Sequence, residues 1–310
     1  MSKKVSVIIP TYKRPVYLPR AINSVINTGW DNLEIIIADD NSDGDDYRKE
    51  TEELMKNYLR EYSFIKYIKH KKNINGSAAR NSGFRESTGD YIMFLDDDDE
   101  FYPDKIKEQV KFLDEHDETW GACYTKYYDV NDKGVVAKGV ECKQGNLLIN
   151  ELARNLFVHA GSNLMVRRKV VEELNGFDET FLRNQDVEFL VRILKQYKLG
   201  FVDVLGLAVH VHPRKYKISY HELTKQYLER FNSDITSLHE NDKKAVLKMI
   251  GLQLVRNAFQ NKDISSAIQF MHTYDIATID IIRYFSHLLY RVISHKAYGY
   301  PMEKLYGKKK

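Results

Sequence analysis

The sequence predicts an α/β fold with a mostly parallel central sheet. Apolar strand-like runs alternate with amphipathic helix-like segments up to about residue 118, which is the pattern of strands joined by helical crossovers. Polar or acidic side chains follow three of these runs, at residues 11–12, 39–40 and 96–99. Because open α/β sheets bind ligands at the carboxyl ends of their strands, we expect the three clusters to line one cleft.

The first strand, the first helix and the second strand follow from simple patterns. Residues 5–9 form a β-branched run that Pro10 ends, which predicts a buried strand. Residues 18–26 carry apolar side chains at helical spacing, and Gly29 stops this helix. Residues 33–38 form the second strand, which predicts a parallel pair with a right-handed crossover.

The same alternation continues as far as the acidic cluster. We expect a charged helix over residues 46–62, a third strand over 64–68, and a loop that enters a short helix over 73–83. Residues 91–95 form a short buried strand that runs directly into four carboxylates. A further helix is predicted over residues 103–116.

Beyond residue 120 the expected elements are shorter and less regular. They are β segments over residues 120–130, 135–142 and 157–166, a helix introduced by residues 184–186 and closed by Gly200, and a last strand over 206–212. From about residue 220 the pattern indicates helices. We therefore divide the chain into an α/β domain, residues 1–215, and a helical C-terminal extension, residues 216–310.

The composition limits the class of protein. With 310 residues, of which 43% are apolar, the chain can form a large core. Its 47 basic and 44 acidic residues nearly balance, which argues against a nucleic-acid partner. Cys123 and Cys142 lack metal-ligand spacing and are expected to be reduced. We see no apolar signal or membrane-spanning segment, and expect a cytoplasmic protein that reaches at most the inner face of the membrane.

The four consecutive carboxylates at residues 96–99 indicate a metal site. Like charges at the end of an apolar strand repel one another unless a cation lies among them. Mg²⁺ and Mn²⁺ prefer oxygen ligands and commonly combine carboxylates with the phosphates of a substrate. A solvated acidic turn is the alternative, but the position after a buried strand favours metal and phosphate binding.

Four runs of the sequence have the order and spacing of one known family: VSVIIPTYKRP, IIIADDNSDG, GSAARNSGFRESTGDYIMFLDDDDEFYPDKI and NGFDETFLRNQDVEFLVRI. They resemble family 2 glycosyltransferases with the GT-A fold, and the match covers residues 4 to about 212. The resemblance implies a metal-dependent, inverting transfer of a sugar from a nucleoside diphosphate sugar to a hydroxyl acceptor. It also suggests a role in assembling bacterial surface glycans.

The resemblance assigns a nucleotide site to the ends of the first strands. Its expected members are Pro10, Thr11, Tyr12, Arg14, Asp39, Asp40, Arg80, Asn81 and Asp97. A carboxylate accepts the ring N–H of uracil, which favours a UDP-sugar as donor. Arg80 is suited to phosphate because its guanidinium donates two parallel hydrogen bonds. The alternatives are an Asx turn for the aspartate pair and a surface position for the arginine.

The resemblance also assigns the metal ligands and the catalytic base. Asp98, with Asp96 and Asp99, corresponds to the metal-binding aspartates of the family, and His212 is a further candidate ligand that is equally compatible with a structural role. Asp186 corresponds to the general base that takes the proton of the acceptor hydroxyl. Alternatively, it is an acid placed in the first turn of a helix by the helix dipole. The usual preceding glutamate is Gln185 here.

The C-terminal extension resembles no family that we can identify. Apolar residues recur there at helical spacing between 281 and 292, and the chain ends in three lysines. We expect the extension to pack on the catalytic domain or to form a homodimer. The alternative is contact with an anionic membrane, where a lipid-linked glycan acceptor would reside.

The sequence disfavours three other functional classes. A sugar-phosphate nucleotidyltransferase shares the sheet and the carboxylates, and a dehydrogenase shares the sheet. Both need a glycine-rich phosphate loop after the first strand, and PTYKRP contains no glycine. A non-catalytic protein that binds sugar nucleotides as a scaffold is disfavoured by the presence of both Asp98 and Asp186.

Overall fold

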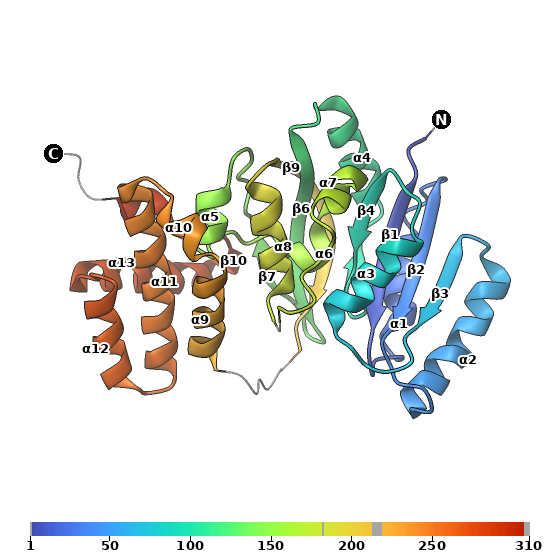
Figure 1. Cartoon of the computed structure of the whole chain (residues 1–310), viewed down its shortest axis with the longest axis horizontal. Coiled ribbons are helices and arrows are strands. Elements are labelled where there is room, and N and C mark those ends of the chain that lie inside the picture. Colours follow the sequence, from blue (N-terminus) through green and yellow to red (C-terminus); the bar gives the residue numbers. More distant parts are fainter. Residues whose placement is uncertain (1, 182, 213–218, 307–310) are drawn as a thin grey trace. The chain divides into compact units, whose positions relative to one another are not determined.

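The computed structural model describes residues 2–181, 183–212 and 219–306. The chain forms two compact units (Figure 1): an α/β unit of residues 1–147 and 158–211, and a helical unit of residues 148–157 and 212–310. The domain boundary that the sequence predicts, at residues 215–216, lies outside the described residues.

The first half of the α/β unit is a parallel sheet. Its strands are β1 (Val5–Thr11), β2 (Leu33–Asp39), β3 (Ile65–Lys69) and β4 (Tyr91–Phe94). They lie in the order β4-β1-β2-β3, and every neighbouring pair is parallel. The β-branched runs in β1 and β2 are buried on both faces, as expected for strands that helices cover on both sides.

Helices connect these strands, as the sequence predicts (Figure 1). They are α1 (Leu18–Ile26), α2 (Asp46–Glu61) and α3 (Gly76–Glu86), and a further helix, α4 (Lys105–Glu115), leads into the second half of the unit. Asp45 caps α2 by accepting a hydrogen bond from the N–H of Tyr47, and Asn75 caps α3 by accepting one from the N–H of Ala78. Because α3 begins immediately after the cap, its first turns lie beside the carboxyl end of the sheet, close to the acidic residues.

The second half of the α/β unit is mixed. It contains β5 (Glu100–Phe101), β6 (Trp120–Asn131), β7 (Gly134–Gly139), β8 (Met165–Arg167) and β9 (Lys198–His210). β8 joins the parallel half by pairing antiparallel with β4, and β6 pairs with β7, β8 and β9. The chain thus curls a second set of strands around the end of β4, where the four carboxylates follow.

Two details of this half differ from the prediction. Residues 157–166 are mostly not a strand: they contain the short helix α6 (Ala160–Asn163), and only their end joins β8. Gly200 lies inside β9 and does not close the preceding helix α8 (Gln185–Leu194). A Cβ atom at Gly200 would lie 2.1 Å from the ring of Phe112, so this glycine is required by packing.

The helical unit contains the remaining elements. They are α5 (Leu148–Leu152), α9 (Tyr220–Arg230), α10 (Asn232–Thr236), α11 (Glu240–Gln260), α12 (Ile264–Thr273), α13 (Thr278–Ser294), β10 (Lys296–Ala297) and the 3₁₀ turn Met302–Lys304. The long helix α11 is buried along most of its length and supplies the core of this unit. Asn155 exchanges two hydrogen bonds with the backbone of Tyr300, which ties the segment 148–157 to the C-terminal part of the same unit.

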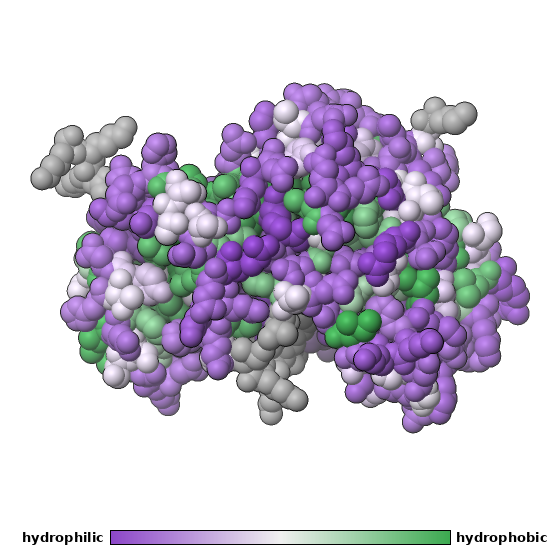
Figure 2. All heavy atoms as spheres, viewed as in Figure 1, coloured by the Kyte–Doolittle hydropathy of each residue, from purple (hydrophilic) through white to green (hydrophobic). Residues whose placement is uncertain are grey.

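One face of α13 remains exposed and apolar. Figure 2 shows apolar side chains at the surface of the helical unit, where α12 and α13 lie. On α13 the exposed fractions of its large apolar side chains range from 49% to 72% at Ile279, Ile282, Leu289, Tyr290, Val292 and Ile293. Within the described residues, none of the helices combines the length and the apolar character needed to span a bilayer.

Candidate active site

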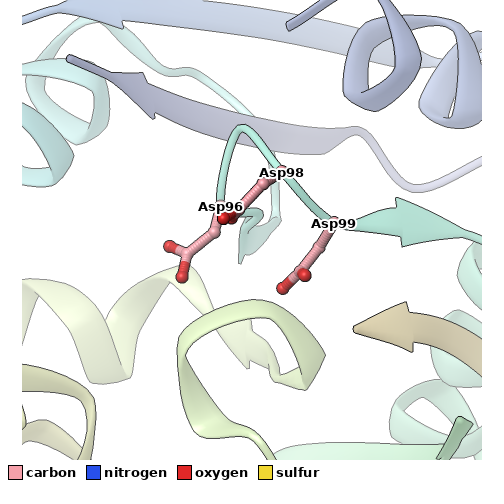
Figure 3. Close-up of side chains that lie close together, drawn as sticks. All are labelled: Asp96, Asp98 and Asp99. Atoms are coloured by element: carbon pink, nitrogen blue, oxygen red, sulfur yellow. The ribbon is translucent and has the colours of Figure 1, made fainter. Parts of the chain in front are cut away.

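The acidic turn after β4 brings three carboxylates together. The N–H of Asp99 donates to the backbone oxygen of Asp96 at 3.0 Å, which closes a turn. One oxygen each from Asp96, Asp98 and Asp99 lies within 4.8 Å of the others (Figure 3). Asp98 and Asp99 are buried and Asp96 is half-buried. Three converging carboxylate oxygens on a partly open turn suit a hard divalent cation, whose remaining coordination positions can bind substrate phosphates.

Two arginines reach into this carboxylate cluster. Nη1 of Arg14 lies 2.7 Å from Oδ2 of Asp98 and 3.2 Å from Oδ1 of Asp97. Arg80, on α3, forms an ion pair with Asp96. Both arginines were expected to bind the nucleotide, and the structure places them at the edge of the metal-type cluster. A guanidinium at this edge can bind a phosphate that also contacts a cation.

Burial changes the protonation of the acidic turn. It raises the pKa of Asp97 to about 7, although Arg14 and a hydrogen bond from the hydroxyl of Thr11 oppose the shift. Burial and the charge of Asp96 raise the pKa of Asp99 to about 7, against a hydrogen bond from Ser162. Near neutral pH the turn therefore retains protons that a divalent cation would displace.

Ser162 on α6 fixes the acidic turn from the opposite side. Its Oγ donates to Oδ2 of Asp99 at 2.6 Å and accepts from the N–H of Asp96 at 3.1 Å. The N–H of His210, at the end of β9, donates to the other oxygen of Asp99 at 3.1 Å. The sequence does not identify Ser162, because residues 157–166 have the composition of a strand and predict no helix at this position.

A buried lysine holds α6 in place. Lys105, at the start of α4, is fully buried, and its Nζ donates to Oδ1 of Asn163 at 2.6 Å, to the backbone oxygen of Asn163 at 3.1 Å and to Oγ1 of Thr125 at 3.2 Å. Burial lowers the pKa of Lys105 to about 7. Because Asn163 directly follows Ser162, this network sets the position of the serine that holds Asp96 and Asp99.

Asp186 and Asp96 of the acidic turn both lie beside Gly161 of α6. Asp186 is half-buried in the first turn of α8, after Asn184, whose φ of 57° turns the chain into the helix. A methyl group built on Gly161 would lie 3.7 Å from Oδ2 of Asp186 and 3.8 Å from Oδ2 of Asp96. Because both distances start from one point, the two oxygens are at most about 7.5 Å apart. The structure thus brings together two carboxylates that are 90 positions apart in the sequence.

The neighbour of Asp186 is engaged by the protein. Nε2 of Gln185 donates to the backbone oxygen of Phe181 at 3.0 Å. The amide that stands in place of the family's glutamate therefore supports the loop before α8.

The aspartates after β2 have different environments. Asp39 is fully buried and accepts hydrogen bonds from Tyr67 at 2.5 Å and from the N–H and side-chain amide of Asn41 at 2.8 Å, and it forms an ion pair with Arg48 at 3.0 Å. Burial raises the pKa of its carboxyl. Protein donors thus enclose Asp39, and its expected contact with the base stays a prediction.

Asp40 is also buried, but its two oxygens carry unequal loads. Oδ1 accepts from Nδ1 of His70 at 2.8 Å and from the N–H of Ile74 at 2.9 Å, whereas Oδ2 accepts from the amide of Asn73 at 2.6 Å. The nearby Tyr12 is exposed, and the N–H of Lys13 donates to the side chain of Asn41 at 2.9 Å. The loops after β1 and β2 are therefore joined, as a shared ligand site requires.

The remaining expected site residues are less directly placed. Pro10 is half-buried inside β1. The amide of Asn81 is engaged by the backbone of Phe177 and by Glu179, so it holds the turn that precedes α8. His212 belongs to the helical unit and is not one of the clustered residues, and its role as a metal ligand stays a prediction.

Comparison with known proteins identifies the family. The model of the family described as Glycosyl transferase family 2 matches residues 6–175. The chain belongs to this family. An uncharacterised glycosyltransferase of Rickettsia conorii is 32% identical over 245 residues, which are 74% of this chain and 38% of the relative. The chain thus spans about two fifths of the length of this Rickettsia relative.

A relative of more similar length is named for a specific transferase activity. The GalNAc(5)-diNAcBac-PP-undecaprenol β-1,3-glucosyltransferase of Campylobacter jejuni is 27% identical over 233 residues, covering 72% of this chain and 73% of the relative.

Two solved structures share the GT-A fold of this family 2 glycosyltransferase. Residues 1–349 of S. aureus TarS, in complex with UDP-GlcNAc, align with a TM-score of 0.67 at 17% identity, covering 94% of this chain and 88% of TarS. The mannosyltransferase PcManGT of Pyrobaculum calidifontis, in complex with GDP-Man and Mn²⁺, aligns with a TM-score of 0.58 at 17% identity, covering 94% and 81%. The predicted α/β fold of GT-A type is therefore confirmed.

Proposed function

We propose that this glycosyltransferase is metal-dependent and inverting, and that it transfers a sugar from a nucleoside diphosphate sugar to a hydroxyl group of a glycan acceptor. One observation carries the proposal. Asp186 and the carboxylate cluster flank Gly161, with carboxylate oxygens at most about 7.5 Å apart. A base and a metal-bound diphosphate must reach the same sugar, and carboxylates this close can do so.

Asp96, Asp98 and Asp99 are the proposed ligands of Mn²⁺ or Mg²⁺. The cation would neutralise charge that develops on the departing diphosphate. The convergence of three oxygens within 4.8 Å supports this assignment, as does the Mn²⁺ of the neighbour PcManGT. Arg14 and Arg80 now bind the carboxylates, and their guanidinium groups are placed to turn toward phosphate oxygens once a cation takes over this role.

Asp186 is the proposed general base. The acceptor hydroxyl must lose its proton while its oxygen attacks the anomeric carbon from the face opposite the leaving diphosphate. Asp186 and the metal-type cluster both lie beside Gly161, so we place the sugar there, in reach of the base and of the metal-bound diphosphate. Attack from the opposite face gives inversion.

The proposed donor carries uracil. The N–H of the buried Asp40 donates to the backbone oxygen of Thr11 at 2.9 Å, which joins this aspartate to the loop that contains Tyr12, and a carboxylate binds a base that offers a ring N–H. Uracil and guanine both do so, and the neighbours TarS and PcManGT were solved with UDP-GlcNAc and GDP-Man respectively. We favour UDP and treat GDP as the direct competitor.

The acceptor is proposed to be a glycan, either free or lipid-linked. The Campylobacter relative is named for its action on an undecaprenol-linked glycan, which supports a lipid-linked acceptor. The exposed side chains Ile279, Ile282, Leu289 and Ile293 recur on α13 at spacings of three, seven and four residues, which place them on one face of the helix as in a helix-packing seam. This spacing supports a homodimer through α13, with contact at a membrane surface as the other occupant to test.

Calorimetry tests the donor site. UDP, GDP and dTDP are titrated into the wild type and Asp98→Ala, with and without Mn²⁺. We expect the wild type to bind UDP in a Mn²⁺-dependent manner that the variant loses. If no nucleotide binds under any condition, the transferase assignment fails for this chain.

Binding without turnover would instead favour the scaffold alternative. A screen of UDP-sugars for hydrolysis by the wild type separates the two cases, because a scaffold binds the donor and does not consume it.

A further inference from the structure

His70 connects three parts of the proposed nucleotide site. It directly follows β3, and 12% of its side chain is exposed. Nδ1 lies 2.8 Å from Oδ1 of Asp40, and Nε2 lies 2.9 Å from Oγ of Ser82 on α3. Its backbone N–H donates to the backbone oxygen of Asp39 at 2.9 Å. His70 is thus fixed by both its side chain and its backbone between the end of β2 and the helix that carries Arg80.

The hydrogen bonds define which nitrogen of His70 carries the proton. Nη2 of Arg85 donates to Oγ of Ser82 at 2.8 Å, so the serine hydroxyl can direct its own proton to Nε2 of His70. Nδ1–H then donates to Asp40, which as a carboxylate only accepts. The donors therefore run in one direction, from the guanidinium of Arg85 to the carboxylate of Asp40.

This row of hydrogen bonds leaves one acceptor position open on the carboxylate of Asp40. A carboxylate oxygen offers two lone-pair positions. His70 and Ile74 fill both positions of Oδ1, whereas among the described residues Asn73 is the donor to Oδ2. Because Asp40 is only 2% exposed, it cannot rotate freely to use other positions. The remaining position on Oδ2 suits one N–H donor and rejects a lone pair.

We propose that His70 is a positioning residue that sets the base specificity of the donor site. By filling Oδ1 of Asp40, it directs the remaining acceptor of Oδ2 toward the ring N–H of a uracil or guanine base. Cytosine presents a ring lone pair at the corresponding place and is repelled. The inference rests on the proposed function, since it presumes that Asp40 reads the base of a nucleotide donor.

A nucleophilic role for Ser82 does not fit the same contacts. Asp40, His70 and Ser82 have the connectivity of a nucleophilic triad. However, Oγ of Ser82 accepts a hydrogen bond from Arg85, and the residue lies inside α3, where the helix continues to Glu86. The geometry therefore favours a fixed hydrogen-bond chain.

Two substitutions separate the two nitrogens of His70. In His70→Asn the side-chain amide can replace Nδ1 and keep the bond to Asp40. In His70→Gln the longer amide can replace Nε2 and keep the bond to Ser82. UDP and CDP are titrated calorimetrically, with Mn²⁺, into the full chain of the wild type and of each variant, and thermal unfolding reports whether each variant is folded.

We expect the wild type and His70→Asn to prefer UDP to CDP by similar factors. His70→Gln should lose about tenfold or more in UDP affinity, and its preference should fall toward one. In transfer assays KM for the donor should rise while kcat changes little. If His70→Gln does not fold, His70→Ala provides the same test, because it also removes the donor to Oδ1 of Asp40. Ser82→Ala keeps that donor and should keep the UDP preference, as His70→Asn does.

The outcomes distinguish the two levels of inference. A wild type that binds none of the nucleotides contradicts the proposed function. A wild type that prefers UDP, together with a folded His70→Gln or His70→Ala variant that keeps this preference, overturns the role of His70 alone.

Discussion

Gly161 is the position where one methyl group should separate folding from catalysis. In Gly161→Ala the added methyl would lie 3.7 Å from Asp186 and 3.8 Å from Asp96, which is ordinary van der Waals contact. The fold can therefore accept it. Alanine restricts the unfolded chain more than glycine does, so the variant should be as stable as the wild type or more stable by about 0.5–1 kcal/mol. For a chain of this size, that corresponds to about 1–1.5 °C in Tm.

The same methyl lies against both the proposed base and Asp96 of the metal-type cluster. If the sugar lies there, the ring must move by about 1 Å, and a displacement of that size costs about 100-fold in rate, or about 2.7 kcal/mol. We therefore expect kcat/KM to fall about 100-fold while UDP affinity and Tm are retained. The assay combines donor hydrolysis or transfer, UDP calorimetry and thermal unfolding on the same preparation.

UDP itself serves as the control ligand, because it lacks the sugar and should not meet the new methyl. A Gly161→Ala variant with wild-type kcat/KM would refute the placement of the sugar over α6. A variant that loses UDP binding as strongly as turnover would also contradict it.

Three further predictions follow from the site and from α13. The affinity for Mn²⁺ should rise by up to about tenfold per pH unit for each proton displaced as pH approaches 7, because Asp97 and Asp99, each with a pKa of about 7, must release protons. The metal-free protein should become less stable over the same interval, since the folded state holds these protons more tightly than the unfolded state; a pH-independent affinity would contradict this. Lys105→Met should lower kcat/KM about tenfold with little change in Tm, because an apolar residue can replace a buried cation while α6 loses its anchor; unchanged activity would exclude the anchoring role. Leu289→Glu should convert a dimer to a monomer in light scattering, or abolish binding to anionic vesicles if the protein is monomeric, and no effect on either would leave α13 without a partner.

The strands and the acidic turn could be predicted because their signals are local. The β-branched runs of β1 and β2 predict buried strands. Four carboxylates directly after an apolar run repel one another, which predicts that a cation lies among them. The convergence of Asp96, Asp98 and Asp99 then follows from a turn of a few residues.

The unpredicted features depend on contacts between distant residues. Residues 157–166 have strand-like composition, but the side chain of Asn163 bonds to Lys105, Thr125 and Val158, and these bonds favour α6 at that place. Asp39 and Asp40 are adjacent and chemically identical. Tyr67 and Arg48 enclose the first and His70 orients the second, and no local pattern shows this difference.

The most direct test of the central claim compares the wild type with Asp186→Asn, using the sugar nucleotide that the hydrolysis screen identifies. The new glycosidic bond should have the inverted anomeric configuration by NMR. Asp186→Asn should bind UDP as the wild type does, with kcat lower by about 10²–10⁴-fold. Retention of configuration, or near-wild-type turnover by Asp186→Asn, would contradict the assignment of Asp186 as the base of an inverting transfer.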